Sequence, residues 1–242
     1  MARRLPAAIF TAWMTAAGAQ GAEWQALTDQ AIALYRQGQY EKALEPAARA
    51  LDLATRESGA EHPAVATSLN NLAVQYRALG RFAEAEPLYI RSLAIREKVR
   101  GPDHPEVATA LDNLAMLHDA QTRFERAEPL YQRALAIREK AFGPSHLAVA
   151  ASANNLGEMY SAQRRYDKAE PLLKRAFAIR DKALAAEDPD RKKTMDNLAA
   201  LYRAQGQFAL AEEYSFSGRN AEDQNRKLFS APSSAGRSAG RS

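Results

Sequence analysis

The chain has 242 residues, enough to bury a substantial core, and 33 lysine and arginine side chains against 29 aspartate and glutamate side chains give a net charge of +4. It contains no cysteine, which excludes disulfides, a thiol nucleophile and lipidation at a cysteine. The basic excess lies at the two ends, so the body of the chain has no continuous basic stripe of the kind that a nucleic-acid-binding protein needs.

The first nineteen residues differ in composition from everything that follows. Arg3 and Arg4 precede an apolar stretch from Leu5 to Ala17, and Ala17-Gly18-Ala19 offers small residues for cleavage. This pattern predicts a cleaved secretory signal peptide over residues 1–19. An uncleaved anchor and an ordinary N-terminal extension are the alternatives, but the apolar run is short for a membrane-spanning helix of about 20 residues. We therefore expect an exported protein, periplasmic if the host is a Gram-negative bacterium.

A unit of 42 residues then recurs without insertion. The units 64–105 and 106–147 agree at 25 of 42 positions, including the sequence AEPLY and then LAIREK. Such a period is the signature of a repeat architecture. A similar unit follows at 148–189, a degenerate one precedes at 22–63, and a truncated one occupies 190–224. The body of the chain, residues 22–224, is therefore predicted to be one array of five units.

Each unit is predicted to fold as an antiparallel pair of helices. Leu69, Leu72, Ala73 and Tyr76 are spaced i, i+3, i+4 and i+7, which places them on one face of a helix. After a polar break at Ala78 to Arg81, a second apolar stripe predicts a second helix of about 17 residues. Prolines support the helix starts and Gly-Pro pairs support the stops; the residues are Pro63, Pro105, Pro87, Pro129, Pro171, Gly101-Pro102 and Gly143-Pro144.

Two positions in every unit hold a small residue, which predicts close approach of the paired helices at those points. The residues are Ala31, Ala73, Ala115, Gly157 and Ala199 in the first helices, and Ala43, Ala85, Ala127, Ala169 and Ala211 in the second.

These residues resemble the tetratricopeptide repeat, whose pattern is matched by Leu69-x2-Leu72-Ala73-x2-Tyr76 and by Ala85-x3-Tyr89. The linker Gly101-Pro102-Asp103-His104-Pro105, followed by Val107-Ala108, is similar to the kinesin light chain type. Gln30 departs from the pattern, where a leucine is expected. The resemblance implies an all-α fold, a right-handed α-solenoid of about five antiparallel helix pairs.

Two rows of polar side chains are predicted on the inner wall of this solenoid. One position holds asparagine in four successive units, and its neighbour holds asparagine or aspartate. An asparagine amide can both donate to and accept from a peptide backbone, and in the kinesin light chain type such asparagines line the peptide groove. The alternative is that each asparagine bonds to the adjacent repeat and fixes its stacking. The residues are Asn71, Asn113, Asn155 and Asn197, and then Asn70, Asp112, Asn154 and Asp196.

Specificity is expected from side chains one or two helical turns further along, among them Arg77, Asp119 and Arg203. At about 10 Å per repeat, the row of four asparagines would cover roughly nine extended residues. The mixed lining favours no single charge. Of the basic residues that could grip a terminal carboxylate only Lys193, with Asn197 and Arg203, fits, so a carboxylate clamp is not favoured.

No catalytic or metal motif is found. His62, His104 and His146 recur at the repeat period in the turns between units, which indicates helix capping and not a shared ion. His118 falls at a core position that holds Tyr76 and Tyr160 in other units. There is no glycine-rich phosphate loop or H-E-x-x-H motif. We expect no enzymatic activity, no cofactor and no metal.

The sequence thus predicts a protein-interaction module that binds an extended peptide or a partner helix in a concave groove. The alternative is an assembly or scaffold subunit that acts through its ends or its convex surface in an envelope complex, with self-association through the C-terminal end. No nucleic acid and no membrane span after cleavage are expected. Residues 225–242, rich in serine, glycine and basic residues, are predicted to be a disordered tail.

Overall fold

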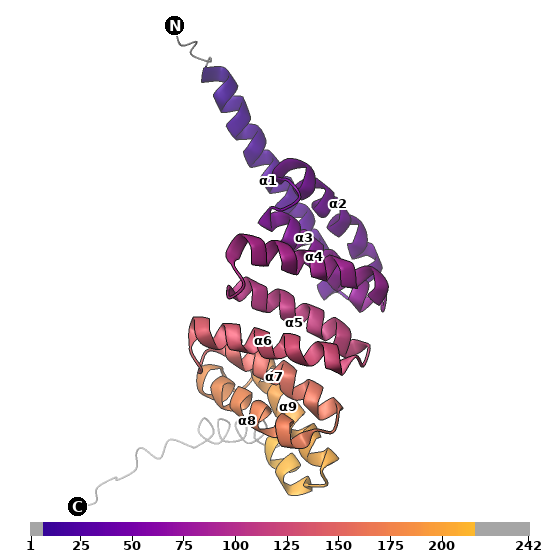
Figure 1. Cartoon of the computed structure of the whole chain (residues 1–242), viewed down its shortest axis with the longest axis vertical. Helices are drawn as coiled ribbons and strands as arrows, with labels where there is room; N and C mark the ends of the chain where they lie inside the picture. Colours follow the sequence, from indigo (N-terminus) through magenta and orange to yellow (C-terminus); the bar gives the residue numbers. More distant parts are fainter. Residues whose placement is uncertain (1–6, 216–242) are drawn as a thin grey trace, which may run out of the picture. The chain divides into compact units, whose positions relative to one another are not determined.

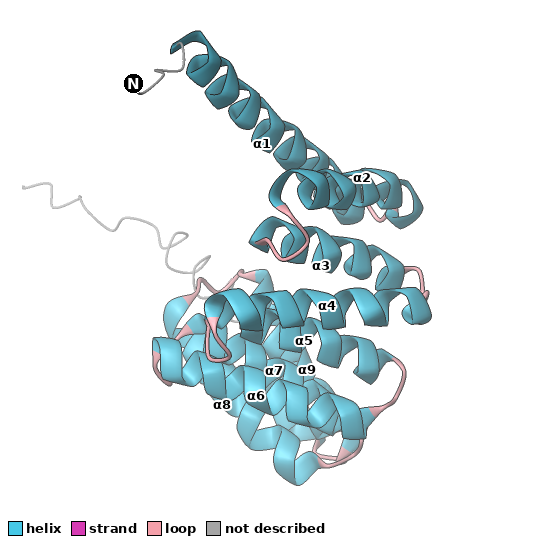
Figure 2. Cartoon of the chain, turned by 45° about the horizontal axis from the view of Figure 1, so that its top comes forward, coloured by secondary structure: helices cyan, strands magenta, loops and turns pink. Residues whose placement is uncertain are grey.

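The computed structural model describes residues 7–215, with side chains from residue 21 onward. The predicted tail 225–242 and residues 216–224 of the fifth unit lie outside the described residues. Within the described part every regular element is a helix (Figures 1 and 2). The helices are α1 (Ala7–Arg36), α2 (Tyr40–Ser58), α3 (Pro63–Ala78), α4 (Phe82–Arg100), α5 (Pro105–Ala120), α6 (Phe124–Phe142), α7 (Leu147–Ala162), α8 (Tyr166–Ala183) and α9 (Pro189–Ala204); residues 208–215 are also helical.

The chain forms two compact units, which we describe one at a time. In unit 1 (Met1–Pro144), consecutive helices from α1 to α6 pack against each other, and α3 also contacts both α1 and α5. In unit 2 (Ser145–Ser242), α7 packs against α8 and α9, and α8 packs against α9. The prediction of consecutive helix pairs is therefore confirmed. We call α1, α3, α5, α7 and α9 the first helices, and α2, α4, α6 and α8 the second helices.

The start of each first helix is fixed by a cap in the preceding turn. The starts at Pro63, Pro105, Leu147 and Pro189 are 42 residues apart. His62 Nδ1 accepts a hydrogen bond from the Ala64 N–H at 3.2 Å, which satisfies a donor that has no partner within the helix. His104 and His146 do the same for α5 and α7, and Asp188 does so for α9. The predicted capping role of the recurring histidines is confirmed.

The second helices are slightly longer than predicted, with 19 residues in α2, α4 and α6 and 18 in α8. Gly101 and Gly143 end α4 and α6 at φ values of 87° and 82°, a left-handed conformation that glycine adopts at low cost. The prolines were expected near the first turn, but Pro87 is the sixth residue of α4. Its missing N–H leaves the carbonyl of Ala83 without an intrahelical donor, and both residues are exposed, so water can supply one.

The predicted small positions are buried between the paired helices. Ala73 and Ala85 are fully buried, and both belong to a cluster with Tyr89. In unit 2 the first-helix position is Gly157, and a Cβ added there would lie 2.8 Å from Cγ of Leu173 on α8. A side chain at this point of α7 would therefore force Leu173 to move.

The turn inside each helix pair has one left-handed residue. It is a glycine in three of the repeats, Gly38, Gly80 and Gly206, with φ between 72° and 75°. The same repeat position holds Thr122 (φ 56°) and Arg164 (φ 59°), residues with a Cβ that disfavours this region. The turn geometry is thus kept even where the preferred residue is absent.

Candidate functional site

One pair of first helices in each compact unit is linked by asparagine side chains. In unit 1, Asn113 Nδ2 on α5 donates to Asn70 Oδ1 on α3 at 2.7 Å. In unit 2, Asn197 Nδ2 on α9 donates to Asn154 Oδ1 on α7 at 2.9 Å. Both bonds join residues 43 positions apart. Each therefore connects an asparagine of the first predicted row, Asn113 or Asn197, to a residue of the second row in the preceding repeat, Asn70 or Asn154. We call these bonds the asparagine rungs. They give Asn113 and Asn197 the stacking role that was one of the two interpretations of the row.

In unit 1, some of the remaining predicted site residues are partly exposed and one is buried. Asn71, Arg77 and Asp119 are partly buried on α3 and α5. Asp112 is only 6% exposed and forms an ion pair with Arg138 of α6. Asp112 therefore holds its own helix pair together and is not placed to meet a ligand, contrary to the prediction for its row.

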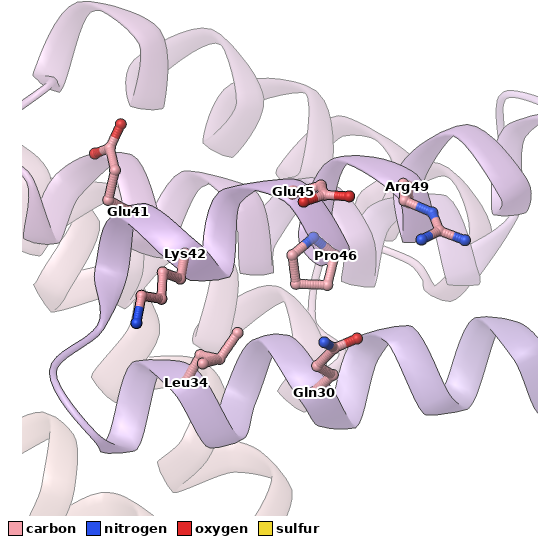
Figure 3. A pocket seen from close by; sticks show the side chains of 7 residues that line it. All are labelled: Gln30, Leu34, Glu41, Lys42, Glu45, Pro46 and Arg49. Carbon is pink, nitrogen blue, oxygen red and sulfur yellow. The ribbon is translucent and has the colours of Figure 1, made fainter.

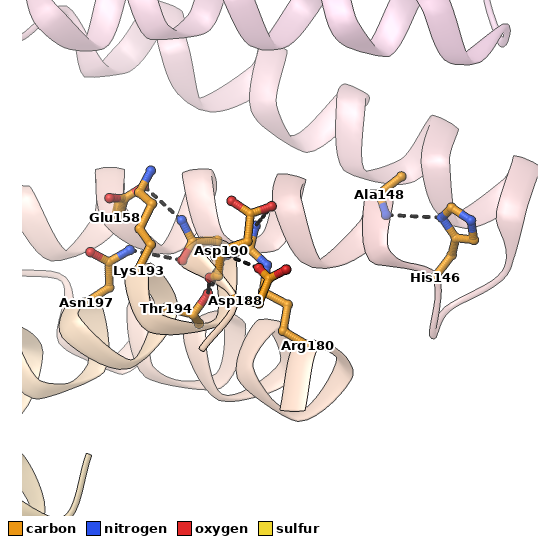
Figure 4. A network of polar contacts seen from close by, with 10 residues as sticks. His146, Ala148, Glu158, Arg180, Asp188, Asp190, Lys193, Thr194 and Asn197 are labelled. Carbon is orange, nitrogen blue, oxygen red and sulfur yellow. Dashed lines mark hydrogen bonds and ion pairs between the residues drawn. The ribbon is translucent and has the colours of Figure 1, made fainter. Parts of the chain in front are cut away.

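In unit 2, Lys193 pairs with Glu158 (Figure 4), and Asn154 contacts the same carboxylate. Asn154 is 1% exposed and donates to Glu158 Oε2 at 2.9 Å, while Lys193 Nζ lies 3.2 Å from the same oxygen. Lys193 therefore has a carboxylate partner within the chain.

Three further site residues of unit 2 lie on first helices. Asn155 is partly buried on α7, and Asp196 and Arg203 are exposed on α9. Arg203 Nη2 donates to Ser215 Oγ at 2.7 Å, so it is tied to the last described turn of the chain.

A second set of polar residues, partly or fully buried, was not predicted from the sequence: the arginine that ends LAIR at residues 93–96 and 135–138, and FAIR at 177–180. Arg96 Nη1 on α4 donates to the carbonyl of Glu106 at 3.1 Å. Arg180 Nη1 on α8 donates to the carbonyl of Asp190 at 2.9 Å and also to Thr194 (Figure 4). These two arginines join a second helix to the first helix that follows it. Their recurrence at the repeat period was the signal that could have identified them.

His118 is buried, as predicted from its repeat position, with 5% of its surface exposed. Burial lowers the pKa of its imidazole, because the charged form is poorly solvated there. The carboxylate of Glu86 opposes this shift, and Arg126 and Arg123 add to it. His118 is therefore a packed core histidine and not an exposed general base.

A pocket of about 380 Å³ lies between α1 and α2 (Figure 3). Leu34 occupies the repeat position that holds Tyr76 and His118 later in unit 1, and Gln30 occupies the position where a leucine was expected. The rest of the lining is mainly charged and comes from α2. The residues are Gln30, Leu34, Glu41, Lys42, Glu45, Pro46 and Arg49.

Between residues 7 and 215, no cluster of three histidine, aspartate or glutamate side chains is arranged to hold a metal ion. Over the same range no helix combines the length and the apolar character needed to span a bilayer.

Comparison with known proteins agrees with this architecture. The tetratricopeptide repeat family model matches residues 25–86, 65–140, 120–182 and 148–215. The chain is an all-α solenoid and belongs to the tetratricopeptide repeat family, whose members are generally protein–protein interaction modules. A search of curated protein sequences found no match.

Solved structures of the kinesin light chain type are among those similar to this chain. The crystal structure of BtubC (BKLC) from P. vanneervenii is 30% identical, with a TM-score of 0.72 over 92% of this chain and 87% of that one. A putative kinesin light chain from Podosopora anserina, with nearly identical TPR-like repeats, is 27% identical, with a TM-score of 0.69 over 84% and 96%. MamA from Desulfovibrio magneticus RS-1, at 17% identity and a TM-score of 0.56 over 84% and 96%, shares the fold.

Proposed function

We propose that this chain is a non-catalytic interaction module that binds an extended peptide, or one helix of a partner, in the concave groove lined by its first helices. We place the contact in unit 1, on α1, α3 and α5. The observation that carries the proposal is the asparagine rung, because it holds amide side chains of α3 and α5 in place before any ligand binds.

The rung leaves part of each amide available to a ligand. Asn113 uses one hydrogen of Nδ2 for Asn70, which leaves its second hydrogen and its Oδ1, and Asn70 keeps both of its donors. Because the receptor side chains are held before binding, little conformational entropy is lost on association. Three first helices about 10 Å apart would span roughly 20 Å, or about six extended residues.

Apolar side chains follow the asparagine positions one turn along each first helix of unit 1. Ile32, Val74 and Met116 occupy the same repeat position on α1, α3 and α5, and all three are partly buried. A segment with uncharged side chains fits this row. In unit 2 the position is held by Glu158 on α7, which is paired with Lys193, and by Ala200 on α9. This difference supports the placement of the contact in unit 1.

The test starts from a random library of nine-residue peptides displayed for selection against the full chain. Hydrogen exchange measured with and without a selected peptide should then show protection of backbone amides in α1, α3 and α5. Protection confined to α2, α4 and α6 would contradict the placement of the site. Failure of the library to yield any binder would count against the function itself.

A second function, assembly through the C-terminal end, is supported by two exposed apolar side chains. Phe208 is 67% exposed, whereas Phe82 and Phe124 at the same repeat position are partly buried. Leu210 is 38% exposed, and the same position in the other repeats holds a charged residue, Lys42, Glu84, Arg126 or Lys168. A Phe208→Ser, Leu210→Lys variant should reduce self-association in light scattering. A wild-type chain that stays monomeric at all concentrations would exclude this function.

We also propose that the protein is exported and that residues 1–19 are removed, on the composition of that segment alone. The residue Ala7 begins α1, which continues without a break to Arg36. N-terminal sequencing of the protein recovered from cell fractions tests the proposal. A retained Met1 in the cytosolic fraction would refute it.

A further inference from the structure

The groove between α1 and α2 is a second interaction surface, separate from the asparagine rungs (Figure 3). Its volume is about 380 Å³. Leu34 of α1 and Pro46 of α2 give it an apolar part, and Lys42, Glu45 and Arg49 of α2 give it charges of both signs. A partner for this groove therefore needs apolar side chains together with charges of both signs.

Two departures from the repeat pattern account for the groove. Gln30 occupies the position of Leu72, which in α3 is buried against the preceding helix pair. Pro46 occupies the position of Leu88, because the proline of α2 comes one residue later than Pro87 does in α4. As a result, Pro46 is buried and turns toward α1, whereas Pro87 is exposed. A proline ring reaches less far than a leucine side chain, so space is left between the two helices.

The charges of the groove follow a helical interval. Glu45 and Arg49 are four residues apart, which places them on one side of α2, and both are exposed. Among the described residues Glu45 forms no ion pair, and Arg49 has a single one, with Glu23 at 3.9 Å. The side chains of that pair are 60% and 58% exposed, so water screens it. Glu45 and Arg49 are therefore both available to a partner.

The complementary pattern of charges occurs in this chain, after the last described helix. Asp223 and Lys227 are also four residues apart, and again the acid comes first. A helix that lay antiparallel to α2 would bring Lys227 to Glu45 and Asp223 to Arg49. Both contacts join opposite charges, whereas a parallel helix would join like charges.

The apolar residues fit the same antiparallel register. Leu228 and Phe229 are the only adjacent pair of large apolar residues after Ser215. With Lys227 opposite Glu45, this pair falls toward the start of α2, where Leu34 lines the groove beside Lys42 (Figure 3). The segment 222–229 therefore matches both the charges and the apolar part of the groove.

We propose that residues 222–229 of a second copy of this chain bind as a helix in the α1–α2 groove. The connection from Ser215 to the segment, residues 216–221, spans at most about 20 Å. At 10 Å per repeat, α1 and α5 of unit 1 are already about 20 Å apart, and Ser215 comes two helix pairs later in the chain. Each copy offers one groove and one segment, so the contact is head-to-tail. It depends on neither the proposed peptide site nor the contact proposed at Phe208 and Leu210.

A labelled synthetic peptide of residues 219–232 tests the contact by fluorescence anisotropy. The receptor is the full chain with Leu228→Ser and Phe229→Ser, so that its own segment does not compete. Binding should weaken as salt is raised, and Arg49→Glu should weaken the Kd at least about 5-fold, because an attraction becomes a repulsion. Arg91→Glu, at the same repeat position on α4, is the matched control. Equal binding by wild-type and Arg49→Glu receptors would overturn the proposal.

A charge swap tests the antiparallel register. A peptide with Asp223→Arg should bind the wild-type groove as weakly as the wild-type peptide binds Arg49→Glu. The two substitutions together should restore the Kd to within about 2-fold of the wild-type pair. If the swapped pair binds no better than either single change, Asp223 and Arg49 do not meet and the register is wrong.

Sedimentation of mixed full-length variants tests the second copy as the donor of the segment. One chain carries Arg49→Glu and the other carries Asp223→Arg, and both carry Phe208→Ser and Leu210→Lys to remove the contact proposed there. Each should stay monomeric alone, and the mixture should associate, because every groove then finds a matching segment on the other chain. A monomeric mixture, with peptide binding intact, would assign the segment to its own chain and refute the second copy.

Discussion

Asn113 on α5 donates a hydrogen bond to Asn70 on α3, and the two side chains meet at 2.7 Å although they are 43 residues apart in sequence. In unit 2, Asn197 and Asn154 repeat the contact at the same interval. The bond therefore belongs to the repeat and not to one local environment. A row of identical residues on a predicted binding surface can therefore form hydrogen bonds between neighbouring repeats as well as contacts with a ligand.

The first prediction is that Asn113 and Asn70 are energetically coupled. Each single alanine substitution should lower the free energy of unfolding by about 0.5–1.5 kcal/mol, because each leaves the other amide without its partner. The double variant should lose less than the sum of the two, as measured by urea denaturation in a double-mutant cycle. Asn71→Ala is the control. Strict additivity of the two substitutions would show that the rung contributes no stability.

The second prediction concerns the close approach of α7 and α8. Gly157→Ala should destabilise the protein by about 1–3 kcal/mol from overpacking against Leu173, partly offset by about 1 kcal/mol of gained helix propensity. Chemical denaturation measures the net loss. In a Leu173→Ala background the same change should cost nothing, because the atoms that it meets are gone. A stabilising Gly157→Ala in the wild-type background is the result that would refute the packing argument.

The third prediction follows from the left-handed residue of the turn between α5 and α6. Thr122→Gly should raise the free energy of unfolding by about 0.5–1 kcal/mol, since φ is 56° there and glycine pays no Cβ penalty. Thr122→Ala keeps a Cβ and should give no such gain. Thermal denaturation of the pair decides the matter, and equal Tm values for the glycine and alanine variants would contradict it.

The fourth prediction is a pH dependence from His118. Burial lowers the pKa of His118 in the folded protein, so near and below the ordinary pKa of about 6.5 the unfolded chain binds more protons than the folded one. Its contribution to stability is therefore complete above about pH 6.5 and is lost as the pH falls through the folded-state pKa.

The variant His118→Tyr should remove this acid sensitivity, because Tyr76 and Tyr202 occupy the same repeat position without titrating in that range. Urea denaturation between pH 4 and pH 8, a range set by about two units on either side of the histidine pKa, measures the slope. The surface substitution His62→Asn, which keeps a capping residue, is the control. An unchanged slope in His118→Tyr would assign the acid sensitivity to other groups.

Much of the fold followed from periodicity because a repeated environment selects the same residue at the same position. The capping histidines, the glycines that end α4 and α6, and the buried alanines all recur at the repeat interval, and the structure confirms their roles. The proline position was less accurate, since a sequence pattern does not specify how far before Pro87 the helix begins.

The candidate site was less predictable, because helical spacing gives the face of a residue but not what covers it. Asp112 shares a repeat position with Asn70, yet the guanidinium of Arg138 on the adjacent helix pairs with it and buries it. Thr28 shares that position as well, and its hydroxyl is buried without a hydrogen-bond partner. These differences depend on contacts between helices, which the repeat pattern treats as equivalent.

The equal interval in sequence between the starts of the first helices has a consequence for how such a chain can be lengthened. A tandem duplication of residues 63–104 would add one helix pair with its own cap and its own terminal glycine, and would shift every later residue by a whole period. The Asn71 of the inserted copy would face the original Asn70, as Asn113 does now. Lengthening the array by gene duplication would therefore add a hydrogen bond between first helices with each new helix pair.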